Sequence, residues 1–335
     1  MKCLTGRKYN VFSMIIYLIA GFLILSGCGG SETVVNPVVP TSTPSVTATP
    51  TVTPPWSVSL TDVQSAITKD PNSKWIAGNT SVTDNYTEEE AKVLCSLIPE
   101  ENSSGKSNYM PSDKTLPGAF SWKNYKGSNW MTSVCDQGLY GTGVAFASIG
   151  ALEVMMRISR DDAALDVNLS EWYLWWNGTG GKNPVPGKWY LDVPGLFLTL
   201  TGTVSESDCP YSQIPDYTDP NQYITYYRAT EYQYVSGKDS MKEAILAGPV
   251  VGGMKVYADF CYYKKGIYKH LTGNYLGDQA ILLIGWDDSQ NCWIAKNSWS
   301  SDWGDSGYFW IDYDEVRNYG YLYKGITVVE PVLEK

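Results

Sequence analysis

The sequence contains a single histidine, His270, among its 335 residues. One imidazole excludes metal sites that need two histidines and limits histidine-dependent catalysis to this residue. Basic residues are outnumbered by acidic ones. The sequence has 25 Lys and Arg and 35 Asp and Glu, so its net charge is −10. With no basic surplus to neutralise phosphates, we expect no nucleic-acid partner. No zinc spacing, EF-hand loop, phosphate loop or dinucleotide fingerprint occurs, so we expect neither a metal nor a cofactor.

What is plentiful indicates a large folded core. Hydrophobic residues make up 43% of the chain, which includes 25 Tyr and 13 Trp. This composition excludes a wholly disordered or collagen-like protein. The length allows one large domain or two ordinary ones.

Residues 1–27 have the organisation of an export signal. Three basic residues within the first eight positions precede an apolar run from 11 to 25, which is short for a membrane span and typical of a signal peptide. The run ends in Leu-Ser-Gly-Cys, which resembles the lipobox of prokaryotic lipoproteins, and this resemblance implies lipidation of Cys28. We therefore expect a protein held at the cell membrane by a lipid anchor and facing the extracytoplasmic side. An uncleaved N-terminal helix is the alternative.

Residues 28–55 predict a tether. This stretch is rich in Pro, Thr, Val and Ser and carries no charge after Glu32. Proline removes backbone donors from helices and sheets, so we expect an extended, semi-rigid linker. Two folded sections follow it, at 56–113 and 114–335.

Helix signals come early in the folded part and strand signals come late. Thr87 and Glu90 fit a capping box, and Ala91, Leu94 and Cys95 lie on one face of the helix that it would start. A Gly-rich turn and a nearly all-apolar stretch then predict a buried central helix, and four apolar runs predict strands. The central helix is expected near 144–156, a short helix at 241–246, and the strands at 249–257, 279–287, 292–299 and 307–314. This order predicts an α+β fold.

These segments, in this order, resemble the papain family of cysteine peptidases, and cathepsin B-like members most closely. The motifs that carry the resemblance are "QGLYGTGVAFAS" at 137–148, "NLSEWYL" at 168–174, the long run at 248–288 and "CWIAKNSWSSDWGDSGYFWI" at 292–311. In addition, "WIAGN" at 75–79 resembles a motif of the cathepsin B propeptide, so 56–113 is expected to be propeptide-like. The resemblance implies a two-lobed fold, with a central helix in a helical lobe and a β-barrel-like second lobe.

The residues that react in this family are missing here. Peptidases of the family need a cysteine at the start of the central helix and a histidine in the β-lobe. The matching positions hold Gly143 and Gln279, whereas the oxyanion glutamine and the histidine-orienting asparagine are matched by Gln137 and Asn297. A glycine has no reactive group, and a carboxamide does not shuttle protons near neutral pH. The resemblance therefore implies an inactive homologue that keeps two supporting residues.

Neighbouring cleft positions also depart from the family pattern. Thr142 precedes the nucleophile position, and Trp299 follows the KNS of the asparagine motif. Where the family lines its substrate cleft with a Gly-Gly pair, the alignment places Leu191 and Asp192. Side chains at these two positions would narrow or recharge the cleft.

The favoured hypothesis is a non-catalytic protein that binds a peptide or protein in a vestigial cleft, with its own propeptide-like segment as one candidate ligand. Two alternatives remain open: an active cysteine peptidase with a displaced nucleophile, and a carbohydrate-binding surface protein that uses Trp175 and Trp176. His270 matches a histidine of the family that is not the catalytic one, and we expect it at the exposed end of a strand. Cys135 is expected to pack or pair rather than to attack.

Overall fold

The computed structural model describes residues 56–100, 108–110, 112, 115–181, 185, 187–211 and 225–329. These residues belong to one compact unit. The expected signal peptide, tether and lipidation site Cys28 lie outside the described residues, as do 101–107 within the expected propeptide-like section.

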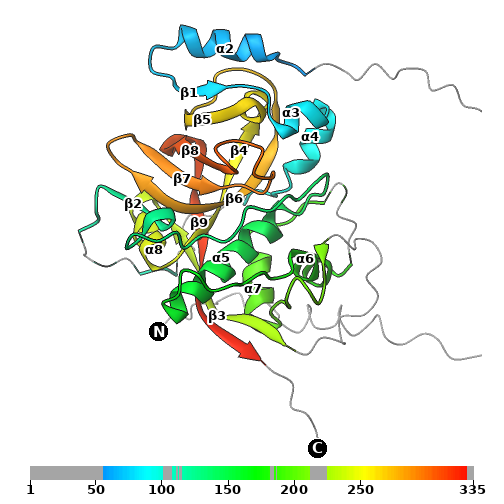
Figure 1. Ribbon diagram of the computed structural model, residues 1–335, viewed down its shortest axis with the longest axis vertical. Helices are drawn as coiled ribbons and strands as arrows, with labels where there is room; N and C mark the ends of the chain where they lie inside the picture. The colour runs from blue at the N-terminus through cyan, green and yellow to red at the C-terminus, as the bar shows by residue number, and fades with distance from the viewer. Residues whose placement is uncertain are drawn as a thin grey trace, which may run out of the picture. The chain divides into compact units, whose positions relative to one another are not determined.

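Three short helices and one strand form the described N-terminal section, drawn in blue and cyan in Figure 1. They are α2 (Leu60–Lys69), β1 (Lys74–Ala77), α3 (Ser81–Asn85) and α4 (Glu88–Leu94). The predicted capping box at the start of α4 is confirmed. Thr87 Oγ1 accepts a hydrogen bond from the backbone N–H of Glu90 at 3.2 Å, and the Glu90 carboxylate accepts one from the Thr87 N–H at 2.8 Å.

The remaining helices are α5 (Gly143–Arg160), α6 (Glu171–Thr179), α7 (Asp192–Leu200) and α8 (Lys238–Ala247), with 3₁₀ turns η1 (Trp122–Asn124), η4 (Ala258–Tyr262) and η5 (Tyr313–Glu315). The central helix α5 is the predicted one, and its first fourteen residues are all buried. It packs against α6 and α7 on one side and against strands β6 and β9 on the other (Figure 1). A helix enclosed in this way is apolar all round, which explains its sequence.

The strands in the described part of the chain form one mixed sheet of nine. Besides β1 they are β2 (Ala119–Ser121), β3 (Tyr226–Ser236), β4 (Val250–Tyr257), β5 (Tyr263–Tyr268), β6 (Tyr275–Asp287), β7 (Cys292–Lys296), β8 (Tyr308–Asp312) and β9 (Val316–Val329). Their order is β1-β5-β8-β7-β6-β4-β9-β3, with β2 paired to β6. Among the strands of the described residues, only β5 and β8 pair in parallel, and the other pairs are antiparallel.

The predicted strand runs correspond to β4, β6, β7 and β8, and the α+β class is confirmed. Strand β6 lies at the centre of the sheet between β4 and β7, and its register places Gln279 opposite Met254. Because β6 also contacts α5, the residue at 279 faces the start of the central helix from the sheet side. No helix within the described ranges is both long enough and apolar enough to cross a membrane.

Candidate functional site at the start of the central helix

Residues from three separate parts of the chain meet where α5 begins. Gln279 comes from β6, Gln137 from the loop before α5, and Ser298 from the turn after β7. Gln279 Nε2 donates to Gln137 Oε1 at 2.9 Å, and Ser298 Oγ donates to the same oxygen at 2.7 Å. The side chains of both glutamines are fully buried. The centre of the site is therefore a closed network of neutral polar groups.

Gly143, the first residue of α5, leaves the space that Gln279 occupies. A Cβ atom built on Gly143 would lie 2.7 Å from both Gln279 Nε2 and Gln279 Oε1, and 3.0 Å from Gln137 Oε1. Contacts under 3.0 Å are essentially never seen for real Cβ atoms. Any side chain at 143 therefore requires Gln279 to move.

The Gln279 amide has partners in either of its two orientations. When it is turned by 180°, its nitrogen donates to the Leu94 carbonyl at 2.6 Å and its oxygen accepts from Trp299 Nε1 at 3.2 Å. Both orientations keep the side chain between the central helix and α4. A carboxamide in this position hydrogen-bonds its neighbours but does not transfer a proton near neutral pH.

The other predicted positions surround this network. Asn297 is buried, its Oδ1 accepts from the Ser298 N–H at 2.9 Å, and its Nδ2 has no partner among the described residues. Trp299 is buried against Phe260, with ring centroids 5.6 Å apart. The Thr142 hydroxyl is hydrogen-bonded to Tyr211 Oη at 2.6 Å. None of these groups is a base placed beside a nucleophile.

Leu191 and Asp192, which the alignment assigned to the cleft, follow closely after a residue whose backbone pairs with the segment 96–98. Leu191 is fully buried and Asp192 is the exposed first residue of α7. The backbone of Trp189 provides the cleft's hydrogen bonds: its N–H donates to the Ser96 carbonyl and its carbonyl accepts from the Ile98 N–H, both at 2.9 Å.

Residues 94–98 lie directly over this site. Ser96 Oγ accepts a hydrogen bond from the Gly143 N–H at 3.1 Å, and Gln137 Nε2 donates to the Leu94 carbonyl at 3.2 Å. The Leu97 N–H donates to the Asp278 carbonyl at 2.9 Å. The backbone donor at the start of α5 and the Gln137 amide are thus both engaged by the N-terminal section.

Two glycines of the sheet make room for these residues. A Cβ atom on Gly253 of β4 would lie 2.3 Å from Leu97 Cδ2, and one on Gly277 of β6 would lie 2.7 Å from the Cβ of Cys95. Gly277 also has φ of 150°, which few other residues adopt. Neither glycine was singled out from the sequence: Gly253 lies within the predicted run 249–257, and Gly277 lies just before the predicted run 279–287.

The cysteines near the site lack the properties of nucleophiles. Cys95, Cys135, Cys261 and Cys292 are free thiols. Burial raises the pKa of Cys135 to about 12 and that of Cys292 to about 12, and it also raises the pKa of Cys95 and Cys261. Buried thiols of this kind stay protonated at neutral pH and are weak nucleophiles.

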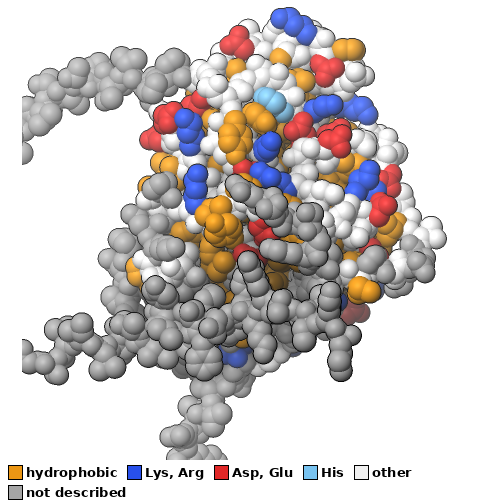
Figure 2. All heavy atoms as spheres, turned by 180° about the vertical axis from the view of Figure 1, so that it is seen from behind, with side chains coloured by type: hydrophobic (Ala, Val, Ile, Leu, Met, Phe, Trp, Pro, Cys, Tyr) orange, Lys and Arg blue, Asp and Glu red, His pale blue; other side chains and the backbone are white. Residues whose placement is uncertain are grey.

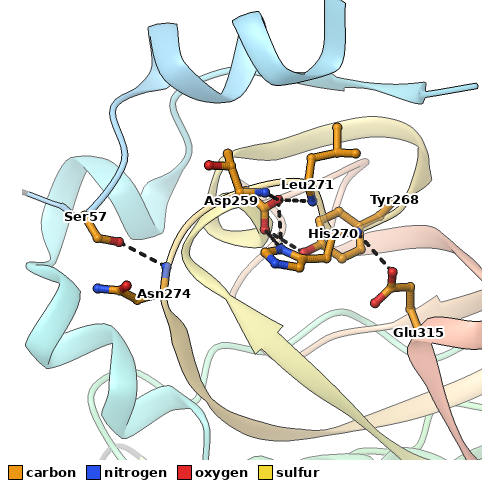
Figure 3. Close-up of polar contacts among 8 residues, drawn as sticks. Ser57, Asp259, Tyr268, His270, Leu271, Asn274 and Glu315 are labelled. Atoms are coloured by element: carbon orange, nitrogen blue, oxygen red, sulfur yellow. Dashed lines mark hydrogen bonds and ion pairs between the residues drawn. The ribbon is translucent and has the colours of Figure 1, made fainter. Parts of the chain in front are cut away.

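His270 lies in a polar cluster on the sheet side and not at a simple exposed strand end (Figure 3). Its Nδ1 is 3.1 Å from Asp259 Oδ1, and its ring stacks on Tyr257 with centroids 3.6 Å apart. Asp259 is fully buried and also accepts from Tyr268 Oη and from the N–H of Leu271. The imidazole thus supports a loop and is paired with a carboxylate, not with a thiol.

A small cavity with a mixed polar and apolar lining lies beneath the site, between α5 and β6–β7. It measures about 20 Å³, and its lining includes the Glu153, Glu171, Lys296 and Asn297 side chains. This volume suits a single water molecule. Burial raises the pKa of Glu153, and it raises the pKa of Glu171 well above its usual range. The cavity is too small for an organic ligand.

Of the two tryptophans of α6 considered for sugar binding, Trp175 is buried and offers no ring face. Trp175 is 1% exposed and packs edge-on against Trp189, with ring centroids 5.4 Å apart. Trp176 is partly buried and lies against Trp172 at 5.5 Å. A sugar stacks on an accessible ring face, and Trp175 has none.

No group of three or more His, Cys, Asp or Glu side chains that could hold a metal ion occurs among the described residues.

Known proteins resemble this chain in both sequence and fold. The family model described as "Papain family cysteine protease" matches residues 116–327. "Cathepsin B-like CP3" of Giardia intestinalis is 32% identical over 202 residues, or 54% of this chain and 64% of that protein. "Cathepsin B-like protease 1" of Arabidopsis thaliana is 46% identical over 77 residues, or 22% of this chain and 20% of that protein. The chain thus matches less than two thirds of the length of either relative.

Solved structures show the same fold at lower sequence identity. Procathepsin B S9 from Trypanosoma congolense superposes with a TM-score of 0.66 at 21% identity, covering 80% of this chain and 98% of that one. Xylellain, a cysteine protease from Xylella fastidiosa, gives a TM-score of 0.57 at 21% identity, covering 70% of this chain and 96% of that one. The chain belongs to the papain family of cysteine proteases, and its relatives include cathepsin B-like members.

Proposed function

We propose that this protein is a catalytically inactive member of the papain family that works by binding. One observation carries the proposal. The nucleophile position is Gly143, and the space beside its Cα is filled by the carboxamide of Gln279, which replaces the family's histidine. Nucleophilic acyl transfer needs an activated nucleophile within hydrogen-bond reach of a base, and this site offers neither.

The remaining groups support binding instead. Gln137 Nε2, the Gly143 N–H and the backbone of Trp189 donate hydrogen bonds to an extended segment, and the Trp189 and Asp278 carbonyls accept them. Such backbone pairing holds an extended peptide without any reacting group. We propose that the ligand of this cleft is a peptide or protein segment, and that residues 94–98 fill it in the resting protein.

The described thiols give little support to a displaced nucleophile. Each of the four for which a pKa shift is resolved has a raised pKa caused mainly by burial. The test is an assay of the purified chain on a cathepsin-type fluorogenic peptide, with an epoxide thiol inhibitor as the control. We expect no inhibitor-sensitive turnover. Turnover that the inhibitor blocks, and that one Cys→Ser change abolishes, would overturn the proposal.

We further propose that the protein is a lipoprotein held at the outer face of a cell membrane. The support is the signal-like run and lipobox-like sequence ending at Cys28, followed by the Pro- and Thr-rich stretch to residue 55. Intact mass of the protein from the membrane fraction is the direct test. A chain beginning at residue 28 with added lipid mass is the expected result, and Cys28→Ser should abolish the lipid. An unprocessed chain of full mass would contradict it.

A further inference from the structure

A row of tyrosines lies across strands β3 and β9. Tyr232 and Tyr234 come from β3, and Tyr319 and Tyr321 come from β9. Their rings lie in a chain of contacts, with centroids 6.1 Å apart for Tyr232 and Tyr321, 5.3 Å for Tyr234 and Tyr321, and 5.8 Å for Tyr234 and Tyr319. Tyr319 and Tyr321 are 5% and 4% exposed. The two phenols are therefore fixed by packing.

Both of these buried phenols meet Glu100, which follows the cleft segment. Tyr321 Oη donates to Glu100 Oε1 at 2.7 Å, and Tyr319 Oη accepts from the Glu100 N–H at 3.0 Å. One residue is thus held through its side chain and its backbone. A hydrogen bond from a neutral phenol to a carboxylate is charge-assisted, and such bonds are about twice as strong as neutral ones.

The surroundings keep the phenols protonated. Burial raises the pKa of Tyr321, and the hydrogen bond to Glu100 raises it further. Burial also raises the pKa of Tyr319, while the positive charge of Arg317 acts in the opposite direction. Tyr321 is therefore a hydrogen-bond donor at every physiological pH, and it requires an acceptor. Its acceptor in this structure is the Glu100 carboxylate, whereas the Arg317 guanidinium is paired with Asp278.

We propose that Tyr319 and Tyr321 form a recognition site for a peptide carboxylate, and that the protein binds in trans an extended peptide with an acidic residue three positions after an aliphatic one. The idea rests on the binding function proposed above and specifies its ligand. The segment from Leu97 to Glu100 displays the required chemistry: Leu97 enters beside Gly253, and Glu100 reaches the tyrosines. A partner peptide with the same spacing displaces it.

The spacing is the discriminating feature. In an extended chain three residues span roughly 10 Å, so only a carboxylate at that position reaches the phenols while the aliphatic side chain stays in the cleft. A glutamine at the same position would keep the shape of the side chain and lose its charge. Its hydrogen bond from Tyr321 would be weaker, since bonds to charged groups contribute more.

A fluorescein-labelled, C-terminally amidated peptide, Leu-Ser-Ser-Leu-Ile-Pro-Glu, tests the proposal by fluorescence anisotropy. It copies residues 94–100 with serine in place of Cys95, and its partner peptide ends in Gln instead of Glu. The protein is the full chain carrying Leu97→Ala, which weakens the hold of its own segment. The unsubstituted chain is measured beside it, so that an effect of the substitution on folding is recognised.

We expect the Glu peptide to bind roughly tenfold more tightly than the Gln peptide. Tyr321→Phe should abolish that preference, whereas Tyr232→Phe, a change in the same tyrosine row, should preserve it. Equal affinity of the two peptides would overturn the proposal, and so would dimerisation of the chain without peptide binding. Neither outcome bears on turnover, so the failure of this site and the failure of the proposed inactivity are separate results.

Hydrogen exchange on the full chain provides a second measurement that needs no peptide. Glu100→Gln should speed exchange at the N–H groups of Leu97 and Ile98, because the segment loses its contact with Tyr321. Glu89→Gln, which changes an exposed carboxylate of α4, should leave these rates unchanged. Identical exchange in both variants would contradict a role for the tyrosine pair.

Discussion

Gln279 of strand β6 occupies the space beside Gly143 of helix α5 that a side chain at 143 would need. The two residues therefore depend on each other: the glutamine fits because position 143 has no Cβ, and the glycine is enclosed because the glutamine is there. In an active papain-family enzyme the same two positions must hold a cysteine and a histidine at bonding distance. A single reverse change at either position cannot rebuild that pair.

The first prediction concerns this pair. Gly143→Cys alone should lower the free energy of unfolding by about 1–3 kcal/mol, because the new Cβ overlaps the Gln279 amide. In the double variant Gly143→Cys/Gln279→His, the new thiol should have a pKa below the usual 8.5, since it lies at a helix N-terminus beside an imidazole. The pH dependence of iodoacetamide alkylation at position 143, followed by mass spectrometry, measures this pKa.

The matched control is Gly143→Ser/Gln279→His, which has a similar shape and no thiol. Alkylation elsewhere should stay slow, because burial raises the pKa of the native thiols Cys135 and Cys292 to about 12. A new thiol that titrates near 8.5 would mean that the imidazole is not beside it. In that case Asn297 does not orient an imidazole at position 279 toward position 143, as the resemblance to the family implies.

The second prediction tests how the cleft receives residues 94–98. Gly253→Ala adds a methyl carbon that would lie 2.3 Å from Leu97 Cδ2. At this distance the two groups overlap, so the Leu97 side chain must move. Exchange of the Leu97 and Ile98 N–H groups should become at least severalfold faster. Adding Leu97→Ala should restore part of the protection, because the smaller side chain leaves room for the methyl group. A double variant less protected than either single variant would contradict a direct contact.

Local chemistry made several of these features predictable. Thr87 and Glu90 form a capping box within four residues, so the start of α4 could be read directly from the sequence. The central helix and strand β6 were predicted from apolar runs that need no partner to be recognised. The two positions Gly143 and Gln279 were identified by motifs that flank them on both sides.

Features that depend on pairing between distant strands were not predicted. Strands β3 and β9 are rich in tyrosine, and their mutual register was not evident from either sequence. The parallel pairing of β5 with β8 was equally hidden. The pairing of Trp189 with residues 96–98 was not predicted, because it is made by backbone groups that every residue carries. That Gln279 fills the space at Gly143 follows only from the distance between two elements that are 136 residues apart.

The third prediction concerns pH and the buried carboxyl groups near the cavity. Burial raises the pKa of Glu206 to about 7 and raises that of Glu171 well above 4.5. Between these pKa values and the usual value of about 4.5, the folded state keeps protons that the unfolded state has released. The free energy of unfolding therefore falls as the pH rises above about 4.5. The contribution of Glu206 to this fall ends above about pH 7. Urea unfolding between pH 5 and pH 8 measures this loss.

Glu171→Gln removes a carboxyl group that must ionise in a buried place. It should reduce the loss of stability between pH 5 and pH 8 by on the order of 1 kcal/mol. Asp166→Asn, at an exposed position, is the control and should leave the slope unchanged. A wild-type protein that becomes more stable across this range would show that these groups are ionised in the folded state.

The last prediction concerns the loop that His270 supports. The Asp259 carboxylate accepts from Tyr268 Oη, from the N–H groups of Leu271 and Thr272, and lies 3.1 Å from His270 Nδ1 (Figure 3). Asp259→Ala leaves these buried donors without an acceptor, and should cost about 2–4 kcal/mol in the free energy of unfolding. Chemical unfolding followed by tryptophan fluorescence measures the loss.

The same loop holds the N-terminal section. The Asn274 N–H donates to Ser57 Oγ at 3.2 Å, and its side chain donates to Glu88 Oε1 of α4 at 3.2 Å. His270→Phe keeps the stacking on Tyr257 and loses the contact with Asp259, whereas His270→Ala loses both. If the carboxylate contact orders the loop, both variants should speed hydrogen exchange in residues 56–60 to a similar extent. If Phe matches the wild type and only Ala is faster, the stacking orders the loop and the charge of Asp259 does not. Figure 2 shows the histidine side chain at the surface near acidic and basic side chains, so these substitutions are made at a position that solvent reaches.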